Sequence, residues 1–166
     1  GKMKRRYNST LYRNKIQTVT KAIPDVCIGA DVIVGFPGET EQEFEKTLQF
    51  IKDLPISYLH VFSYSERENT EAIHFDDVVS KQKRSERSKQ LRILSEKLQR
   101  NFNQKYLNTN LSVLFEKENK DGFLYGFTEN YIKVKIHFEK KYCTTIQTIK
   151  LLSFDENGNI NAKIVS

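Results

Sequence analysis

Cysteine is scarce in this chain of 166 residues, which has only Cys27 and Cys143, far apart in the sequence. They can form one disulfide at most, which is not the framework that small secreted domains use. Metal ligands usually cluster at fixed spacing, whereas His60, His74 and His137 are isolated from one another. The sequence therefore predicts that this chain alone binds neither a metal ion nor a metal cluster.

Long apolar runs are missing too. No segment approaches the roughly 20 apolar residues that span a bilayer, and no apolar stretch follows the charged residues 1–6, which excludes a secretory signal there. With 38% hydrophobic and 11% aromatic residues, the chain can bury a core as one domain or two small ones. Because the first residue is not an initiator and a helix precedes the first expected strand, we expect a piece of a longer protein.

The net charge of +6 is unevenly distributed along the chain. Residues 1–15 carry six basic residues and no acid, and residues 81–106 carry nine basic and two acidic ones, whereas residues 16–80 carry four basic and twelve acidic ones. The basic residues of the first segment are Lys2, Lys4, Arg5, Arg6, Arg13 and Lys15. Segregated positive charge indicates a polyanionic partner, most simply nucleic acid. The alternative is a solvated helix face.

The most informative stretch is a strand, a tight loop and a helix start. Residues 28–34 are a short β-branched apolar run, typical of a strand buried on both faces, and the Gly-Phe-Pro-Gly loop at residues 35–38 ends it. Thr40 and Glu43 have the spacing of a capping box. No Gly-Lys-Ser/Thr follows, so this is not a P-loop. Ligands of α/β folds bind at the carboxyl ends of such strands, so the loop is a candidate site; the alternative is an ordinary turn.

Apolar spacing predicts helices over residues 10–23, 41–54 and 81–106, and a second strand over residues 58–64. Short links between alternating helices and strands favour two parallel strands. Two strands alone make no stable sheet, so we expect partner strands from outside this chain, and self-association through exposed edges. In the last helix the expected buried stripe is Leu91, Leu94, Leu98 and Phe102, with Lys83, Arg84, Arg87, Arg92 and Arg100 off it.

Beyond Asn108 the apolar pattern changes to a period of two residues, in about five short strands punctuated by turn residues such as Asn157-Gly158. We expect these strands to pair antiparallel in a small OB-like barrel. Such barrels commonly bind single-stranded or looped nucleic acid, although the barrel shape alone does not establish this function.

Three motifs occur in order along the chain. They are Lys4-Arg5-Arg6-Tyr7, Asp-Val-Ile-Val-Gly-Phe-Pro-Gly-Glu-Thr at residues 31–40, and His-Val-Phe-Ser-Tyr-Ser at residues 60–65 with Arg67 and Thr70. As a set they resemble the radical S-adenosylmethionine (SAM) methylthiotransferases, and residues 107–166 resemble the RNA-binding TRAM domain that ends these enzymes. The resemblance implies an α/β partial (half) TIM-like barrel of parallel strands over residues 1–80, a connecting basic helix over 81–106, and an all-β OB-like TRAM barrel over 107–166.

Residues 126–131, Gly-Phe-Thr-Glu-Asn-Tyr, are most similar to the branch that thiomethylates threonylcarbamoyladenosine (t6A) next to the tRNA anticodon. The other branches act on isopentenyladenosine in tRNA or on an aspartate of a ribosomal protein. Two further alternatives stay open, namely a non-enzymatic RNA-binding module and an unrelated α/β piece without an RNA role. The partners implied are the anticodon stem-loop of tRNA and the missing N-terminal half of the enzyme, in the cytoplasm and without a membrane.

The family pattern is incomplete here. Its enzymes need Cys-x3-Cys-x2-Cys for one four-iron four-sulfur cluster and three further cysteines for a second, and two cysteines cannot supply them. Glu68 and Asn69 replace a Pro-Gly pair that the family usually has after its arginine. The resemblance implies chemistry in which a reduced cluster cleaves SAM and a methylthio group replaces a hydrogen of the adenine ring. We therefore expect a C-terminal piece that is inactive alone, with both clusters and SAM belonging to the longer enzyme.

The resemblance also implies roles for individual residues. The expected contacts to the adenine of SAM are the backbone of Val32, Ile33, Val34 and Gly35, flanked by Val61 and Phe62. The expected RNA or substrate contacts are Arg5, Arg6, Arg67, Phe127, Asn130, Tyr131 and Lys133. Two alternatives stay open: Glu39 and Thr40 cap their helix rather than act in catalysis, and Phe127 fills the barrel rather than stacking on a base.

Overall fold

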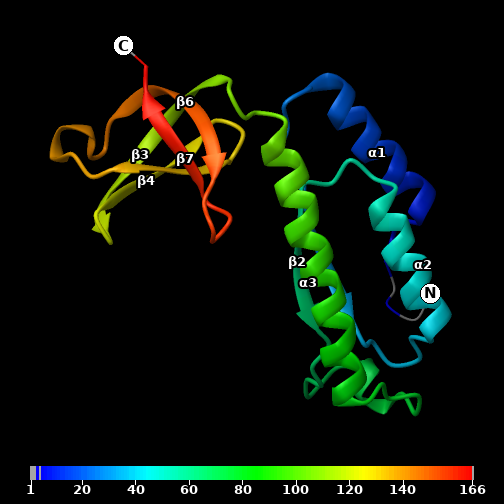
Figure 1. Cartoon of the computed structure of the whole chain (residues 1–166). Coiled ribbons are helices and arrows are strands. Elements are labelled where there is room, and N and C mark those ends of the chain that lie inside the picture. The colour runs from blue at the N-terminus through cyan, green and yellow to red at the C-terminus, as the bar shows by residue number, and fades with distance from the viewer. Residues whose placement is uncertain (1–2, 4, 166) are drawn as a thin grey trace. The chain divides into compact units, whose positions relative to one another are not determined.

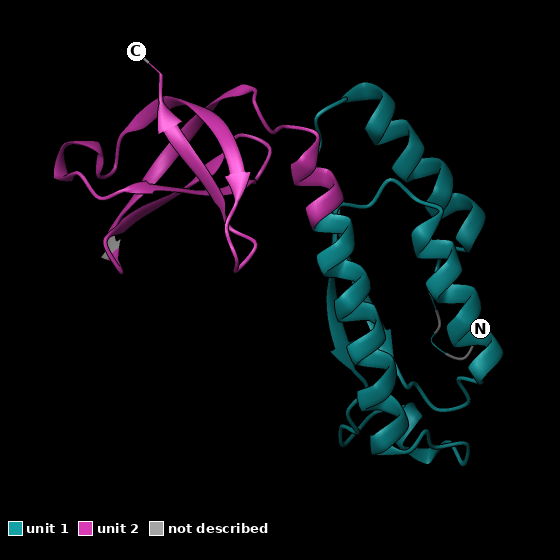
Figure 2. Ribbon diagram, viewed as in Figure 1, with its two compact units in different colours: residues 1–99 teal, residues 100–166 magenta. Residues whose placement is uncertain are grey.

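The computed structural model describes residue 3 and residues 5–165, without the side chain of Asn119. Lys2 and Lys4, two of the basic residues predicted to attract nucleic acid, lie outside the described residues. The chain divides into two compact units, residues 1–99 and residues 100–166 (Figure 2). Each unit has its own sheet and its own buried core, so each is described separately.

The first unit is an α/β unit built around two strands (Figure 1). Its elements are α1 (Ser9–Ala22), β1 (Gly29–Val34), α2 (Glu41–Lys52), β2 (Tyr58–Ser63), the 3-10 turn η1 (Glu71–His74) and most of α3 (Lys81–Gln104). The strands are parallel, with pairing from Gly29 opposite Tyr58 to Val34 opposite Ser63. The predicted helices and the parallel strand pair are confirmed, with ends within about two residues of the expected ones.

Helices pack on one face of this two-stranded sheet and leave the other face open. The buried cluster takes side chains from both strands, from α2, from the α2–β2 link and from α3, with Tyr12 of α1 partly buried against it. Its members are Ala30, Val34, Phe44, Ile51, Leu54, Ile56, Leu59, Leu91 and Leu94. On the opposite face Ile33 is 38% and Phe62 is 52% exposed. The expectation that residues 28–34 are buried on both faces is therefore wrong, because the described helices cover only one side.

The two edges of the sheet differ. At β2, the hydroxyl of Ser95 on α3 accepts a hydrogen bond from Leu59 N (2.8 Å) and donates one to Leu59 O (3.2 Å), so a helix side chain occupies that edge. At β1, no other strand of the described residues pairs with the second edge. This sheet is thus incomplete on the β1 side, where an unpaired strand edge can accept another strand.

The second unit, residues 100–166, contains the end of α3 followed by a closed five-stranded barrel (Figure 1). Its elements are β3 (Asn110–Lys120), β4 (Phe123–Thr128), β5 (Lys133–His137), the 3-10 turn η2 (Lys140–Tyr142), β6 (Ile146–Phe154) and β7 (Ile160–Ile164). The strand order is β3-β4-β5-β7-β6. The expected five strands and the barrel are confirmed, but the expectation that all pairs are antiparallel is wrong. Strands β5 and β7 pair in parallel and close the barrel.

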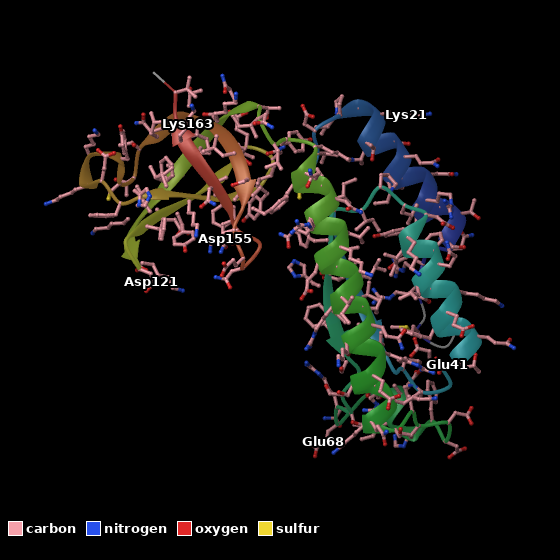
Figure 3. All side chains as sticks on the ribbon, viewed as in Figure 1. Lys21, Glu41, Glu68, Asp121, Asp155 and Lys163 are labelled. Carbon is pink, nitrogen blue, oxygen red and sulfur yellow. The ribbon has the colours of Figure 1, made fainter. Side chains whose placement is uncertain are left out.

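Aliphatic side chains and the ring of Phe115 fill the barrel. The buried side chains include Val113, Phe115, Leu124, Ile132, Val134, Ile149, Leu151 and Ile160. Gly126 is required at its position because an added Cβ would lie 2.6 Å from Leu114 O and from a methyl group of Val113. The predicted turn at Asn157-Gly158 is present, and its amides at residues 157 and 159 donate to Asp155 Oδ1 (2.9 and 2.8 Å; Figure 3 labels Asp155).

Both cysteines are free and half-buried. Burial raises the pKa of the Cys27 thiol above its ordinary value. None of the described helices combines the length and the apolar character that crossing a bilayer requires.

Candidate functional site

The loop after β1 is fixed by local hydrogen bonds. Gly35 and Gly38 both have positive φ angles, of 76° and 85°, which glycine adopts at little cost. Thr40 begins α2: its hydroxyl accepts a hydrogen bond from Glu43 N (3.2 Å), and the Glu43 carboxylate accepts one from Thr40 N (2.9 Å). The predicted capping box is confirmed, so Thr40 is a helix cap.

Glu39 has a different role from the predicted helix cap. Its Oε2 accepts hydrogen bonds from Gly35 N (2.5 Å) and from Arg87 Nη1 (2.8 Å), which ties the two ends of the loop together and joins them to α3. The side chain is largely buried beside Arg87. Glu39 therefore stabilises the loop at residues 35–38 and does not cap α2.

A pocket of about 500 Å³ lies at the carboxyl ends of the two strands, over the open face of the sheet. Its lining residues are Met3, Ile33, Phe36, Phe62, Ser63, Tyr64, Ser65, Arg67, Thr70 and Ala72. Ile33 and Phe62 are directly opposite each other in the strand pairing and supply an apolar surface. Phe36 packs edge-on against Tyr64 and Phe75, with ring centres 5.5 and 6.0 Å apart. Hydroxyl groups and one guanidinium group border this apolar surface, a combination that suits a purine with polar substituents.

The predicted cofactor contacts fall on both sides of the sheet. Ile33 and Phe62 line the pocket, whereas Val34 is buried in the core and Val32 and Val61 pack against that core. Gly35 is buried, and Arg84 lies against its Cα: an added Cβ would be 2.3 Å from Arg84 Cγ. The structure thus brings Ile33 and Phe62 together with Arg67, while Val32, Val34 and Val61 have only backbone atoms to offer a ligand on the open face.

Arg84 and Arg87 do not lie on the basic surface that the sequence predicts for α3. They are only 5% and 3% exposed. Arg84 donates to Val79 O (2.8 Å), Tyr64 O (2.9 Å) and the Glu66 carboxylate. The hydrogen bond from Arg84 lowers the pKa of Glu66 from its ordinary 4.5 to about 2. Both arginines are buried and paired with carboxylates. The expectation that they lie off the buried side of the helix is therefore wrong.

Arg5 and Arg6 are exposed ahead of α1. Exposure leaves these two predicted RNA contacts available to a polyanion. Of the other basic residues in that segment, Arg13 packs over the Phe50 ring at 5.0 Å. On α3, five basic residues are exposed and remain the basic surface of this helix in the first unit: Lys81, Lys83, Lys89, Arg92 and Lys97.

The outer face of the barrel carries aromatic side chains on β4 opposite basic side chains on β5. In the strand pairing, Phe123 faces His137, Tyr125 faces Lys135 and Phe127 faces Lys133. The alternate residues of both strands are buried in the barrel. Lys133 Nζ lies 4.9 Å from the centre of the Tyr125 ring and 5.9 Å from that of Phe127. Phe127 therefore faces outward and does not fill the barrel.

Tyr131 projects from the turn between β4 and β5. It is 67% exposed and has a φ angle of 65°, which is unfavourable for a residue with a side chain. Tyr131 N donates to Thr128 O (2.9 Å), and the Thr128 hydroxyl accepts from Ile132 N (2.8 Å), so the turn holds this conformation. The Tyr131 ring centre lies 5.3 Å from that of Phe127. The turn therefore holds the exposed Tyr131 ring beside Phe127.

Asn130 belongs to the turn rather than to the outer surface. Its Oδ1 accepts a hydrogen bond from the Thr128 hydroxyl (2.6 Å), and its Nδ2 is buried with no hydrogen-bond partner among the described residues. The predicted RNA contact of Asn130 stays a prediction.

The same face continues over two further strands. Leu114 on β3 is paired with Phe127 on one side and with Ile146 on the other, and Leu114 and Ile146 are both exposed. Phe123, Tyr125, Lys135, His137, Leu114 and Ile146 were not predicted as site residues. The alternation around Leu124 and Val134 could have identified the outward residues of β4 and β5. That Ile146 and Leu114 lie beside Phe127 depends on how the strands pair, which the sequence does not reveal.

No group of three or more His, Cys, Asp or Glu side chains among the described residues could hold a metal ion. A chain with two cysteines also lacks the thiolates that a four-cysteine iron–sulfur cluster requires. The described residues therefore do not fit an iron–sulfur cluster.

The described residues thus form an α/β strand pair with a loop-lined pocket, and a small barrel with a basic and aromatic face. Three curated relatives match this combination over most of the chain. Threonylcarbamoyladenosine tRNA methylthiotransferase MtaB of Bacillus subtilis (strain 168) is 35% identical over 155 residues, 91% of this chain and 34% of that protein. MtaB of Aquifex aeolicus (strain VF5) is 36% identical over 80% of this chain and 31% of that protein.

A third relative, tRNA-2-methylthio-N(6)-dimethylallyladenosine synthase of Thermosipho melanesiensis (strain DSM 12029 / CIP 104789 / BI429), is 36% identical over 75% of this chain and 29% of that protein. None of the protein-family models matches the chain. The chain is a homologue of the radical SAM tRNA methylthiotransferases, as its three motifs indicate. It spans about a third of the length of the curated relatives that it matches.

Proposed function

We propose that this chain is the C-terminal part of a tRNA methylthiotransferase that modifies t6A next to the anticodon. The observation that carries the proposal is the incomplete sheet. Its two parallel strands carry two of the motifs, and a pocket lies at their carboxyl ends. Among the described residues, one face of the sheet and the second edge of β1 stay open. The t6A branch is favoured by residues 126–131 and by the names of two relatives at 35% and 36% identity. The dimethylallyladenosine branch is the second candidate, because another relative of 36% identity carries that name.

The pocket on the open face is the proposed site for SAM. Ile33 and Phe62 would contact the face of the adenine ring, and the backbone of residues 32–35 would contact its polar edge, as the family resemblance implies. The Tyr64 hydroxyl is buried at this pocket with no hydrogen-bond partner among the described residues, so a ligand group that reached it would satisfy an unpaired polar atom. When bound, SAM supplies the radical chemistry by which a methylthio group enters the adenine ring of the RNA.

Arg67 borders the same pocket and supplies a positive charge at its polar side. A guanidinium group binds carboxylate or phosphate in a bidentate manner, so Arg67 would hold either the t6A carboxylate or an RNA phosphate. The residues that hold the clusters are not in this chain, because two cysteines are too few. The chain is therefore inactive alone, and the missing N-terminal half would pair with the free edge of β1 and cover the open face.

Without that half, the β1 edge and the exposed Ile33 and Phe62 favour association between copies of the chain. A closed enzyme would bury these groups. The proposed location of the complete enzyme is the cytoplasm, where tRNA is modified.

The barrel face is the proposed surface for the anticodon stem-loop. Aromatic side chains stack on unpaired bases of any sequence, while nearby lysines attract phosphates. Phe127 and Tyr131 lie side by side with their rings in contact distance, and Lys133 lies over Phe127 and Tyr125. Leu114 and Ile146 extend the apolar surface, and Arg5 and Arg6 add positive charge in the first unit. The surface thus suits a loop with unstacked bases better than a continuous duplex.

Binding of the chain to RNA tests this surface directly. Fluorescence anisotropy would compare a labelled anticodon stem-loop with a fully paired duplex of equal length at several salt concentrations. We expect tighter binding of the stem-loop and a steep fall in affinity as salt increases, because phosphate contacts release counterions. Equal binding of both RNAs, or affinity that does not depend on salt, would contradict the proposed stacking surface.

A further inference from the structure

Two buried arginines on α3 contact the carboxyl ends of both strands. Arg84 and Arg87 are three residues apart, so they lie on the same side of the helix. They reach different targets: Arg87 contacts the loop after β1, whereas Arg84 contacts the segment after β2. Both targets include residues at the mouth of the pocket or directly next to it.

Arg87 fixes the loop after β1 through Glu39. Its Nη1 donates to Glu39 Oε2 (2.8 Å) and to Glu39 O (3.1 Å), and its Nη2 donates to Glu41 Oε2 (3.0 Å; Figure 3 labels Glu41). The same Glu39 oxygen accepts the hydrogen bond from Gly35 N. A single guanidinium group thus determines the direction of the first backbone amide after β1, next to the proposed adenine site.

Arg84 fixes the other strand end. Its Nη1 donates to Tyr64 O (2.9 Å), its Nη2 pairs with Glu66, and its Cζ lies 5.2 Å from the centre of the Tyr64 ring. The aliphatic part of the same side chain fills the space where a Cβ of residue 35 would be. Arg84 therefore positions Tyr64 and also limits the approach of the Gly35 loop.

Stability alone does not explain why arginine occupies position 87. Arg87 Nε is buried without a hydrogen-bond partner among the described residues, and the whole group is removed from water. Buried ion pairs of this kind are often no more stabilising than apolar side chains of the same volume. What an apolar side chain cannot supply is the direction of three hydrogen bonds to residues 39 and 41.

We propose that Arg84 and Arg87 are positioning residues that preorganise the two strand-end segments around the pocket. Arg87 acts on residues 35–39 through Glu39, and Arg84 acts on residues 64–66 directly. The assignment of a ligand to the pocket rests on the proposed function. The claim that the two arginines fix the conformation of residues 35–39 and 64–66 does not. The two arginines can therefore be tested on this chain without any enzymatic activity.

Amide hydrogen exchange, measured residue by residue, distinguishes positioning from general stability. We expect Arg87→Met to speed exchange at Gly35 and the adjoining loop amides by about tenfold, and Arg84→Met to do so at residues 64–66, because a charged hydrogen bond is lost in each case. Exchange within the barrel should be unchanged. Amides of α2 that open only by global unfolding report the lower stability of the first unit, so the comparison uses the α2 amides that exchange by local opening, which should be unchanged. Lys83→Met is the matched control, since Lys83 pairs with Glu41 at 3.4 Å while half-exposed, and we expect it to leave both segments unaffected.

A uniform rise over residues 1–99, or no change at either segment, would overturn the proposal. Should a methionine variant not fold, Glu39→Gln and Arg84→Lys weaken the same contacts while keeping the side-chain volume close to the original. Lysine offers one nitrogen where arginine offers three, so Arg84→Lys should restore only part of the protection.

The same variants in the longer enzyme separate this inference from the proposed function. Positioning of a cofactor pocket predicts a fall in kcat with an unchanged KM for tRNA, because neither arginine contacts the proposed RNA face. Loss of local protection in this chain together with unchanged kcat would support the positioning of the loops and contradict the assignment of the pocket to SAM. Unchanged protection would overturn the positioning role, whatever the activity.

Discussion

Gly35 and Arg84 approach each other so closely that a Cβ on residue 35 would lie 2.3 Å from Arg84 Cγ. Gly35 also has a φ angle of 76°. Two independent constraints, backbone conformation and space, thus require glycine at the end of β1. The contact joins the loop of the second motif, residues 31–40, to α3.

Gly35→Ala should therefore destabilise the first unit by more than the cost of a positive φ alone, by about 2–4 kcal/mol. The matched control is Gly122→Ala, because Gly122 has a φ angle of 79° and no atom within 4 Å of its missing Cβ. We expect Gly122→Ala to cost about 1 kcal/mol. Urea unfolding, monitored at the most slowly exchanging amides of each unit, would measure the loss of stability in both variants. Equal losses for Gly35→Ala and Gly122→Ala would contradict the steric role of Arg84.

Arg87→Met should lower the free energy of unfolding of the first unit by about 3 kcal/mol, because it leaves the largely buried Glu39 carboxylate without its cation. Lys83→Met removes an ion pair between two half-exposed side chains and should change stability by less than about 0.5 kcal/mol. Chemical denaturation of the two variants side by side gives both values. A loss as small as that of the control would mean that the Glu39–Arg87 pair is solvated in solution.

The barrel should lose stability in acid through Asp155. The hydrogen bond from Lys135 lowers the pKa of Asp155 from its ordinary 3.8 to about 2. Because the folded state holds the carboxylate form, the stabilisation from Asp155 is fully present above pH 3.8 and is lost as the pH falls through about 2. Carbon-detected NMR titration of the Asp155 carboxyl measures this value, and acid unfolding of Asp155→Asn should lack that step. A midpoint near 3.8 would show that the pair with Lys135 is open in solution.

Removal of the exposed ring of Tyr131 should weaken binding of the anticodon stem-loop by about 1–3 kcal/mol, which corresponds to one lost base stack. Lys133→Gln should weaken binding less and lower the salt slope by about one unit. Lys163→Gln on β7 is the charge-matched control, since Lys163 is exposed but lies on another strand (Figure 3). If the Lys133 and Lys163 variants lower affinity equally, the β4–β5 face is not the RNA surface.

Local features of this fold could be predicted from the sequence, because their causes lie within a few residues. The capping box of Thr40 and Glu43 depends on a three-residue spacing, and the strand ends are marked by glycine and proline. The outward direction of Phe127 also follows from a period of two residues. These features survive whatever packs around them.

Long-range features could not be predicted in this way. Arg87 looked like a surface residue, since its partner Glu39 is 48 residues away in the sequence. The parallel pairing of β5 with β7 closes the barrel through chain topology, which no local pattern encodes. The exposure of Ile33 could not be predicted either. An apolar run indicates that burial of a strand is favourable, but it does not indicate whether a helix of this chain covers each face of the strand.

The most direct measurement for the central claim is the nucleoside content of tRNA from cells that lack the gene encoding this chain. Mass spectrometry of digested tRNA should show that the methylthio form of t6A is lost while t6A itself remains, and reintroduction of the intact gene should restore it. Loss of the methylthio form of the isopentenyl nucleoside instead would assign the enzyme to the other tRNA branch. Unchanged levels of both methylthio nucleosides would contradict the account.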